Sequence, residues 1–517
     1  MPELRAPTTH ANPVIPGFHP DPSICRVGDS FYLVTSSFEY FPGIPVFHSA
    51  DLVSWRQIGH CLTRPSQLDL LTAPASGGIY APTIRWHDGR FYVTSTNATG
   101  GGHFIVSAEC AEGPWSDPVW IRQDGIDPSL YFENGACFFT SNVEPDPAGP
   151  HEASPGFVRG AQQSIVDPMT GEVHSDVRFL WGGSGGSFPE APHLFRRGRH
   201  YYLLMAEGGT EGGHMVTVAR ADSPWGPWEG CPRNPILSHR SSPSPVQATG
   251  HADVVILADG TWWAVFLGTR PVGMYHHLGR ETFLAPMTWD EAGWPVIGND
   301  GCLPERAVRP ALPLGDQVDL HTVDEFDEVL LAPRWITLRR PLTAQEVSLE
   351  TNPGRLTMVG GADTPDDPLL VFVGRRQQHF NCSITADLDF TPAGRDEAGL
   401  TVRIDERHHV DLAVLDRAGR RVVELRQRIG PLSTVTAEAV VDDGPLRLRI
   451  DAEPDHYSFS VCSGDARIVE LGSTETRYLS SEVAGGFTGV VVGMYATGNG
   501  RECSTPALWR RFEYRPL

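Results

Sequence analysis

The chain has 517 residues, a formal net charge of -22 at pH 7 and a hydrophobic fraction of 40%. This length is sufficient for at least two hydrophobic cores, and the composition is that of a globular protein. A strongly acidic chain is a poor partner for nucleic acids or anionic membranes, and no stretch approaches the ~18 consecutive apolar residues of a membrane span. We therefore expect neither partner, whereas a neutral, sugar-like substrate is compatible with the charge.

The first residues and the cysteines indicate a cellular compartment. Residues 1–16 are polar and rich in proline, and they lack the basic start and apolar run of a secretory signal. The nine cysteines are odd in number, widely scattered and without a Cys-x-x-Cys pair. This usage is typical of reduced thiols rather than of a disulfide framework or a zinc site. We predict a cytoplasmic protein.

A short motif and its repeats organise the first three hundred residues. Residues 20–24 (Pro-Asp-Pro-Ser-Ile) are followed by a hairpin over residues 26–34, whose turn contains Gly28. The same order of a short strand, a Gly-containing tight turn and a strand rich in aromatic and β-branched residues returns four times. These further copies start at Ala81, Asp127, Glu190 and, in a looser form, His251. Five such units predict a five-bladed β-propeller, in which each blade is a four-stranded sheet.

Three carboxylates occupy the starts of these repeats. The first strands of propeller blades surround the central axis, so Asp21, Asp127 and Glu190 would become neighbours at one mouth of the channel. Hydrolysis of a glycosidic bond needs one protonated and one ionised carboxyl group, roughly 6.5–9.5 Å apart when the configuration is inverted. The pattern predicts such a pair in Asp21 and Glu190. Asp127, as a third carboxylate, would raise the pKa of the acid by like-charge repulsion.

Glu190 differs from the two aspartates in its register. It lies one residue before the position that is equivalent to Asp21 and Asp127. We expect this offset, together with the longer side chain, to aim its carboxyl group differently. A single Asp-Pro pair is by default a turn or the start of a strand, and it is the repetition that favours a site.

Other chemistries lack their motifs in this chain. There is no Gly-x-Ser-x-Gly nucleophile elbow and no His-Glu-x-x-His zinc pattern. His251, which opens the fifth inner strand, is either a structural histidine or a group near the axis that faces substrate or an ion. The glycine-rich segments at residues 182–187 and 208–213 are either flexible surface loops or places where the backbone approaches a ligand closely.

The sequence changes character after about Leu314. Polar and apolar residues alternate in segments such as residues 383–390, 446–450 and 457–461, which predicts half-buried antiparallel strands. Turn signals at regular intervals predict a β-sandwich. We expect an all-β protein with a catalytic propeller at residues 1–314 and an accessory sandwich at residues 315–517. The sandwich would stabilise the propeller or shape the substrate site.

Seven segments, spread over nearly the whole chain, carry a specific combination of motifs. They include Gly17-Phe18-His19-Pro20-Asp21-Pro22-Ser23-Ile24 within residues 12–24, and further stretches at residues 37–45, 77–82, 127–130, 250–253, 278–282 and 485–489. This combination resembles glycoside hydrolase family 43, in the β-xylosidase and α-L-arabinofuranosidase branch with a C-terminal, concanavalin-like sandwich. The resemblance implies hydrolysis in one displacement with inversion. Asp21 would be the general base, Glu190 the general acid and Asp127 the residue that tunes and orients the acid.

The resemblance also implies the groups that bind the substrate. Arg280 would contact the hydroxyls of the terminal sugar, and Phe38 and Tyr80 would line the pocket. Phe487 would reach over from the sandwich and close the pocket into a dead end, which favours removal of one terminal sugar. His251 corresponds to the family's axial histidine, which places it in the substrate site. The resemblance also allows His251 to bind a structural calcium ion in the channel. The reaction itself would require no cofactor.

Two departures from the family pattern bear on the choice of sugar. Related xylosidases usually read Glu-Gly-Pro-His at the acid and carry a tryptophan where this chain has Tyr80, whereas this chain reads Glu-Ala-Pro-His at residues 190–193. We predict an exo-acting enzyme that releases α-L-arabinofuranose, β-D-xylose or both from hemicellulose-derived oligosaccharides, with arabinofuranose preferred. The alternatives are a retaining fructan or sucrose hydrolase and a non-catalytic carbohydrate-binding protein. The expected partner is a small oligosaccharide, and a homo-oligomer is left open.

Overall fold

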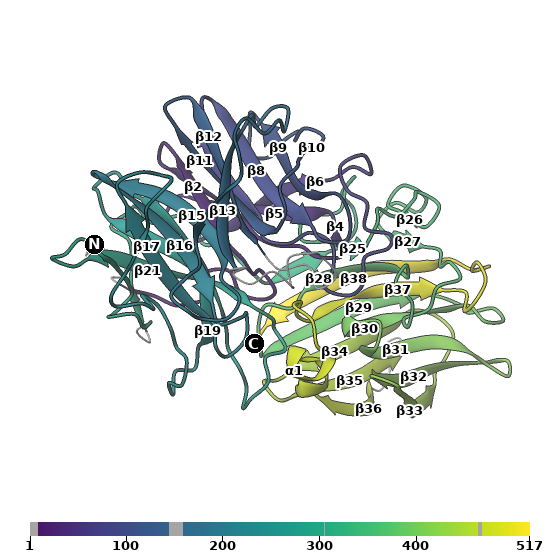
Figure 1. Ribbon diagram of the computed structural model, residues 1–517. Coiled ribbons are helices and arrows are strands. Elements are labelled where there is room, and N and C mark those ends of the chain that lie inside the picture. Colours follow the sequence, from purple (N-terminus) through teal and green to yellow (C-terminus); the bar gives the residue numbers. More distant parts are fainter. Residues whose placement is uncertain (1–8, 144–158, 304–305, 464–467) are drawn as a thin grey trace, which may run out of the picture.

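The protein consists of two β-rich domains that lie side by side (Figure 1). The computed structural model describes residues 9–143, 159–303, 306–463 and 468–517. The N-terminal domain contains five four-stranded antiparallel sheets, and the C-terminal domain contains two larger sheets. The described residues include one short α-helix, α1 (Ser481–Ala484), which follows the 3-10 helix η1 (Thr476–Leu479). None of their helices has the length and apolar character needed to cross a bilayer. The all-β prediction is confirmed.

Each of the five sheets is one blade of a propeller and is built from consecutive strands. The first blade contains β2 (Ser23–Val27), β3 (Ser30–Val34), β5 (Gly43–Ser49) and β6 (Arg56–Leu62). The second contains β7 (Thr83–His87), β8 (Arg90–Asn97), β9 (Gly102–Ala108) and β10 (Val119–Ile121). The third contains β11 (Ile126–Glu133), β12 (Ala136–Val143), β13 (Gly160–Val166) and β14 (Arg178–Trp181). The fourth contains β15 (Glu190–Arg197), β16 (His200–Glu207), β17 (Met215–Ala221) and β18 (Glu229–Gly230). The fifth contains β19 (Gln247–Ile256), β20 (Trp262–Thr269), β21 (Glu281–Trp289) and β22 (Pro295–Ile297).

The five predicted hairpins form the first two strands of the five blades. Each turn contains a glycine with a positive φ between 61° and 84°, at Gly28, Gly89, Gly135, Gly198 and Gly260. A Cβ added at any of these positions would meet no atom within 4 Å. The turns therefore need glycine for its backbone conformation and not for space.

One residue of each motif copy, two positions after Asp21, Ala81, Asp127, Ala191 and His251, takes part in a ring of contacts around the propeller axis. We call Ser23, Thr83, Ser129, His193 and Asp253 the axial ring. Thr83 Oγ1 donates to a backbone carbonyl of the third blade at 2.8 Å, and Ser129 Oγ donates to one of the fourth blade at 2.5 Å. His193 Nδ1 lies 3.5 Å from Asp253 Oδ1, and Ser23 Oγ donates to Asp253 Oδ2 at 2.6 Å. Ser23 Oγ also accepts from a backbone N–H of the second blade at 3.1 Å, which completes the circle.

Arg85 on β7 contacts all five blades. Its Nη1 and Nη2 pair with the Asp253 carboxylate of the fifth blade at 2.7 and 3.1 Å. Nη2 donates to His193 Nδ1 of the fourth blade at 3.2 Å, and burial lowers the pKa of this histidine to about 3, so the ring accepts as a neutral imidazole. Nε donates to the Leu130 carbonyl of the third blade at 3.1 Å, and Nη1 donates to Ser23 Oγ of the first at 3.2 Å.

The two sheets of the C-terminal domain enclose one large apolar core, which includes Leu448, Met494, Trp509 and Phe512. One sheet has the order β26 (Val347–Ser348), β27 (Leu356–Met358), β38 (Ala507–Pro516), β29 (Cys382–Asp389), β34 (Leu446–Ala452), β35 (His456–Ser463) and β36 (Ile468–Glu475), with β24 (Thr322–Asp324) also on β38. The other has the order β28 (Val371–Arg376), β37 (Val491–Thr497), β30 (Glu397–Asp405), β31 (His408–Arg417), β32 (Arg420–Ile429) and β33 (Leu432–Val440). Side chains along β34 alternate between buried and more exposed positions, as the sequence predicted. The sandwich prediction is confirmed.

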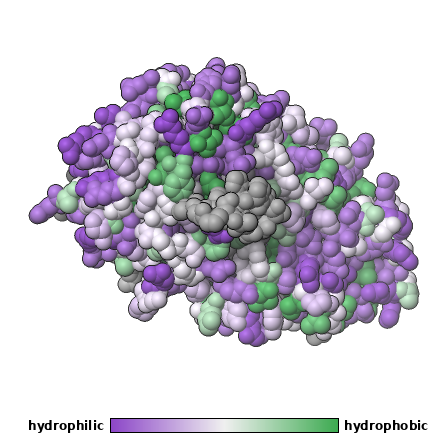
Figure 2. Space-filling model, viewed as in Figure 1, coloured by the Kyte–Doolittle hydropathy of each residue, from purple (hydrophilic) through white to green (hydrophobic). Residues whose placement is uncertain are grey.

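The domains are joined by one short strand pair and a shared apolar cluster. β25 (Thr337–Leu338) pairs with β4 (Tyr40–Phe41) of the first blade, whereas the pair of β23 (Ala307–Val308) with β1 (Thr9–His10) lies within the N-terminal domain. The predicted boundary after residue 314 lies between β23 and β24. The shared cluster contains Phe18, Phe38 and Tyr40 from the propeller and Ile336, Leu338, Leu370, Phe372, Val491 and Tyr495 from the C-terminal part. On the face seen in Figure 2, hydrophilic residues predominate and apolar residues form small groups.

Replacing Arg85 with methionine should destabilise the propeller by about 3–5 kcal/mol, because the buried Asp253 carboxylate would lose its counter-ion. Denaturant unfolding of the purified variants would measure this loss. Arg90→Met is the matched control on the same blade, since the pair between Arg90 and Glu109 (2.9 Å) is at the surface and is worth roughly 1 kcal/mol or less. Equal losses in the two variants would contradict a central role for Arg85.

Candidate active site

In or just before four of the five inner strands lies a non-glycine residue whose φ is in the left-handed region. These residues are Asp21 (55°), Asp127 (52°), Ala191 (52°) and His251 (50°). Ala191 therefore takes the place of the two aspartates in the fourth blade, and Glu190 precedes it, as the register offset in the sequence predicted. Such a backbone costs about 1–3 kcal/mol for a residue with a side chain, and it is found preferentially at functional sites. His251 is the fifth residue of β19 and does not open that strand, contrary to the expectation from the sequence.

Asp21 lies buried at the entrance of the first blade, with 4% of its surface exposed. Its Oδ1 accepts a hydrogen bond from Arg280 Nη1 at 2.9 Å, and its Oδ2 accepts one from Ser36 Oγ at 2.5 Å. His251 Nδ1 lies 3.5 Å from Oδ1. Burial alone would raise the pKa of Asp21, but the Arg280 guanidinium, His251 and the Ser36 hydrogen bond outweigh it and lower this pKa. Asp21 is therefore ionised at neutral pH, as a general base must be.

Arg280 joins three segments of the chain around Asp21. Besides its bond to Asp21, Nη1 donates to Thr210 Oγ1 at 2.9 Å, and Nη2 donates to the Phe487 carbonyl at 3.3 Å. Thr210 belongs to the second glycine-rich segment of the propeller, whereas Phe487 belongs to the sandwich. Arg280 is only 6% exposed, so its position is fixed by these partners.

Glu190 begins β15 and keeps 16% of its side chain exposed, in contrast to the more deeply buried Asp21. Its Oε1 lies 3.8 Å from His214 Nε2. Burial, with a smaller contribution from His251, lowers the pKa of His214 to about 3, so this ring is neutral beside the carboxyl group. A Cβ on Gly250 would lie 2.3 Å from the His214 ring, which explains why glycine precedes His251. The sequence analysis did not identify His214, and Gly250 was the one signal for it.

Asp127 lies near the start of β11 and is 7% exposed.

A second buried polar group, Glu207, was also not predicted from the sequence. Glu207, at the end of β16, is completely buried and accepts backbone N–H groups of Ser184 and Gly186, both at 2.6 Å. A Cβ on Gly183 or Gly186 would come within 2.8 Å or 2.7 Å of this side chain. The glycine-rich segment before Glu190 is thus wrapped around a carboxylate and is not a free surface loop.

Three aromatic side chains from both domains form a wall beside Arg280. Phe38 stacks on Phe487 with ring centroids 6.2 Å apart, and Tyr80 lies 5.4 Å from Phe38 and 6.4 Å from Phe487. The Arg280 guanidinium carbon lies 5.7 Å from the centre of the Phe38 ring. The Phe487 N–H donates to Ser76 Oγ at 2.8 Å, which ties this part of the sandwich to the propeller. The structure therefore brings together all three aromatic residues that the sequence pointed to.

The surroundings of His251 do not suit a calcium ion. Calcium takes about six to eight oxygen ligands, usually including ionised carboxylates. The two carboxylates that influence His251 are Asp21 and Asp253, and each is already in an ion pair with an arginine, Arg280 or Arg85. The Arg280 guanidinium, which helps to lower the pKa of His251, would also repel a divalent cation.

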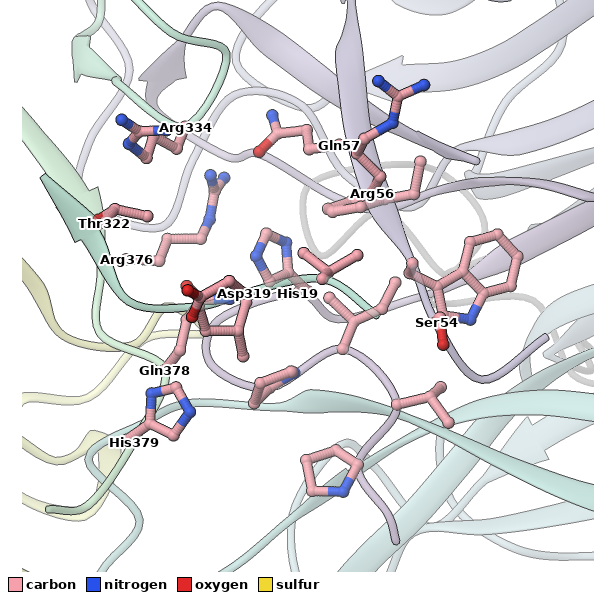
Figure 3. Close-up of a pocket in the computed structure, with 18 of the residues that line it drawn as sticks. His19, Ser54, Arg56, Gln57, Asp319, Thr322, Arg334, Arg376, Gln378 and His379 are labelled. Carbon is pink, nitrogen blue, oxygen red and sulfur yellow. The ribbon is translucent and has the colours of Figure 1, made fainter. Parts of the chain in front are cut away.

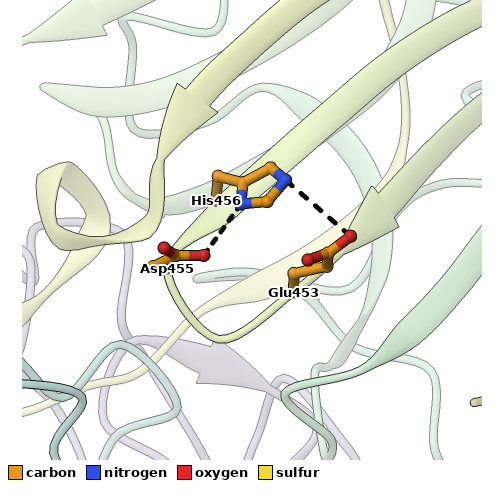
Figure 4. A group of neighbouring side chains, drawn as sticks. All are labelled: Glu453, Asp455 and His456. Atoms are coloured by element: carbon orange, nitrogen blue, oxygen red, sulfur yellow. Dashed lines mark hydrogen bonds and ion pairs between the residues drawn. The ribbon is translucent and has the colours of Figure 1, made fainter.

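A second group of possible metal ligands lies at the surface of the sandwich (Figure 4). Glu453, Asp455 and His456 occupy the turn between β34 and β35. His456 Nδ1 contacts Asp455 Oδ1 at 2.8 Å, and its Nε2 lies 3.8 Å from Glu453 Oε1. Both ring nitrogens thus have carboxylate neighbours already, and the group is accounted for as an exposed ion-pair cluster.

Comparison with known proteins agrees with this architecture. Residues 10–295 match the sequence profile of glycosyl hydrolases family 43, and residues 323–515 match that of the beta xylosidase C-terminal concanavalin A-like domain. The chain is 46% identical to the non-reducing end alpha-L-arabinofuranosidase BoGH43B of Bacteroides ovatus, over 99% of this chain and 96% of that protein. It is 36% identical to a xylosidase/arabinosidase of Butyrivibrio fibrisolvens, over 95% and 96% of the two chains.

Solved structures are similar over the same extent. The Bacteroides ovatus xyloglucan PUL GH43B superimposes with a TM-score of 0.93 at 44% identity, covering 98% of this chain and all of that one. Xylan beta-1,4-xylosidase from Bacillus halodurans C-125 superimposes with a TM-score of 0.91 at 31% identity, covering 98% and 99%. The predictions of a five-bladed propeller with a C-terminal sandwich and of a glycosidase are confirmed. The chain belongs to glycosyl hydrolase family 43.

Proposed function

We propose that this enzyme releases single terminal pentoses from hemicellulose-derived oligosaccharides with inversion of configuration, and that α-L-arabinofuranose is its preferred sugar. The observation that carries the proposal is the buried Asp21 carboxylate, held ionised by Arg280 at the propeller mouth. The names of the arabinofuranosidase and xylosidase relatives support the choice of pentoses.

In the proposed reaction Asp21 acts as the general base. Its carboxylate takes a proton from a water molecule, whose oxygen attacks the anomeric carbon of the terminal sugar. Glu190 gives its proton to the glycosidic oxygen as the bond to the anomeric carbon breaks, so the shortened oligosaccharide leaves as an alcohol. Asp127 orients the acid and raises its pKa. The neutral His214 imidazole adds no positive charge beside Glu190, which favours keeping the acid protonated.

Substrate binding is assigned to the groups around this pair. Arg280 is assigned to the hydroxyls of the terminal sugar, as the family resemblance implies. Phe38, Tyr80 and Phe487 provide the apolar wall on which the sugar ring lies, and Phe487 limits the depth of the pocket from the sandwich side. His251 positions Asp21 and needs no bound metal for this role. The small oligosaccharide remains the proposed partner, whereas a homo-oligomer and the cytoplasmic location stay predictions.

The first experiment is hydrolysis of para-nitrophenyl α-L-arabinofuranoside and β-D-xylopyranoside side by side, with the product anomer followed by NMR. We expect faster turnover of the arabinofuranoside, with β-L-arabinofuranose as the first product, and equal rates in the presence of a chelator. An initial α-anomer would instead indicate the retaining mechanism of fructan hydrolases. Binding of these sugars without turnover of any pentoside would indicate a carbohydrate-binding protein.

Asp21→Asn should lower kcat by about 10²–10⁴-fold on every substrate, because general base catalysis contributes this much. Glu190→Ala should lose a similar factor on para-nitrophenyl substrates or xylo-oligosaccharides, but much less on dinitrophenyl glycosides, whose leaving group needs no proton. Asp29→Asn, at the exposed hairpin turn of the same blade as Asp21, is the control with unchanged rates. If kcat in Glu190→Ala fell by the same factor for all leaving groups, the assignment of Glu190 as the general acid would be wrong.

Arg280→Met should shift the acid limb of the kcat/KM profile to higher pH. Arg280 lowers the folded-state pKa of Asp21, so its removal raises this pKa, and the base becomes protonated at a higher pH than in the wild type. Thr210→Val is the matched control, since it removes only a neutral hydrogen-bond partner of Arg280. An acid limb that stays in place in Arg280→Met, or moves equally in Thr210→Val, would show that another group sets it.

A further inference from the structure

A cavity of about 810 Å³ lies between the propeller and the sandwich (Figure 3). None of Asp21, Asp127 and Glu190 lines it. Its walls come from residues 12–16 and His19, which precede the catalytic aspartate, and from the loop at residues 53–57. Further walls come from residues 317–322 and from the segment around residues 375–381 at the end of β28, together with Phe47, Arg270, Pro333, Arg334 and Leu517. Pockets of this size typically bind small molecules.

The charge of the cavity is opposite to that of the whole protein. Although the chain has a net charge of -22, the side chains that line the cavity include one acidic group, that of Asp319, and five arginines: Arg56, Arg270, Arg334, Arg375 and Arg376. A concave site with one sign of charge focuses the electrostatic field and attracts ions of the other sign. The cavity therefore favours anions.

Three of these arginines already have partners. Arg270 forms two hydrogen bonds with Glu281, at 2.6 and 2.8 Å, and Arg334 contacts Asp324 at 3.1 Å. Arg375 donates to a threonine hydroxyl at 2.5 Å and to a glutamine carbonyl at 2.6 Å. Their charges are thus partly or fully satisfied within the protein.

Arg376 is different. It is only 4% exposed, and its Nε and Nη2 have no hydrogen-bond partner among the described residues. Burial lowers the pKa of Arg376 to about 10, so the guanidinium still carries its charge at neutral pH. The Phe18 ring lies 5.2 Å from its guanidinium carbon, and Tyr40 and Glu39 act on its charge from a distance without a direct ion pair. A buried guanidinium with unsatisfied donors is unfavourable, so this group favours a further anionic partner.

His19 lies beside Arg376 and is also incompletely satisfied. It is 4% exposed, and its Nδ1 has no hydrogen-bond partner among the described residues. Burial and the nearby Arg376 lower its pKa well below the usual range, so the ring is neutral and carries one N–H. Figure 3 shows His19 and the guanidinium groups of Arg376 and Arg334 around the same space, with Gln57 opposite.

We propose that this cavity is a binding site for a small oxyanion, either inorganic phosphate or the carboxylate of an acidic sugar. The planar guanidinium of Arg376 matches two oxygens of such a group at once, and an N–H of His19 supplies a third hydrogen bond. Arg56, exposed at the rim, and the partly satisfied Arg334 add long-range attraction. The proposal does not depend on which sugar the active site hydrolyses.

The position of the two ligands gives the site a structural effect. Arg376 is the last residue of β28 in the sandwich, whereas His19 lies two residues before Asp21 in the propeller. The backbone N–H of His19 donates to the backbone carbonyl of Arg280 at 3.1 Å, and the backbone carbonyl of His19 accepts a hydrogen bond from Thr282 Oγ1 at 2.7 Å. A bound anion would therefore link the sandwich to the segment that carries Asp21, and it should stabilise the two domains together.

The test is thermal unfolding of the full chain in an amine–chloride buffer, with phosphate, glucuronate or sodium chloride added at matched ionic strength. At about 10 mM, phosphate or glucuronate should raise Tm by a few degrees more than chloride does, as expected for a ligand that binds only the folded state. Isothermal titration of wild-type protein with each anion measures the affinity. A response to glucuronate alone identifies an acidic sugar as the ligand, and a response to both identifies a general oxyanion site.

Arg376→Gln should abolish the anion-specific increase, while its Tm in chloride should be no lower than that of the wild type because a buried charge with unsatisfied hydrogen-bond donors is removed. If this variant does not fold, Arg376→Lys keeps the charge without the two-pronged geometry and should bind phosphate at least about tenfold more weakly. Arg122→Gln, which removes a positive charge from an exposed position outside the cavity, is the matched control with an unchanged response. No increase beyond that of chloride in the wild type, or an increase that persists in Arg376→Gln, would overturn the proposal.

Discussion

The axial ring and the guanidinium of Arg85 are the constraint on which the propeller depends. Each blade is a separate four-stranded sheet, and no strand is shared between the first and fifth blades. The circle is closed instead by hydrogen bonds and ion pairs, among which the contacts of Asp253 with Ser23 and Arg85 join the fifth blade to the first and second. Ser23, His193 and Asp253 lie only two or three residues from Asp21, Glu190 and His251. The same contacts that close the ring therefore also set the positions of the catalytic groups.

The active site is completed by the second domain. Arg280 is fixed in part by the Phe487 carbonyl, and the Phe487 ring stacks on Phe38 of the propeller. Beneath this contact, the domains share a buried apolar cluster and the pairing of β4 with β25. In the proposed site the sandwich is thus a wall of the substrate pocket as well as a support for the propeller, so we expect separation of the domains to affect catalysis directly.

Much of the fold and the outline of the site could be predicted because they repeat. The turn glycines, such as Gly28 and Gly260, and the copies of the Asp-Pro-Ser motif reflect a backbone conformation that each blade needs, so the sequence contains each signal several times. Asp21, Asp127 and Glu190 could be singled out for this reason. The family resemblance supplied the substrate-binding residues, which have no repeat of their own.

The groups that were missed are single residues whose partners lie far away in the sequence. Arg85 resembles any strand arginine until its contacts with five blades are known, and Glu207 resembles any strand-end carboxylate until the loop around it is seen. His214 left a trace only in Gly250, whose missing Cβ makes room for the ring. Arg376 left none, because its unsatisfied hydrogen-bond donors can be recognised only when all of its neighbours are in place.

The way in which the ring is closed has a consequence for the order of events during synthesis of the chain. The strands of a blade pair with near neighbours in sequence, whereas Ser23 and Asp253 are 230 residues apart. Local pairings form readily, and long-range ones pay a larger entropy of loop closure, so blades can assemble while the ribosome is still adding residues. The mouth of the channel can form only after the fifth blade has emerged, and its wall only after Phe487 has followed. For most of its synthesis a nascent chain therefore contains Asp21, Asp127 and Glu190 but cannot hydrolyse a glycosidic bond.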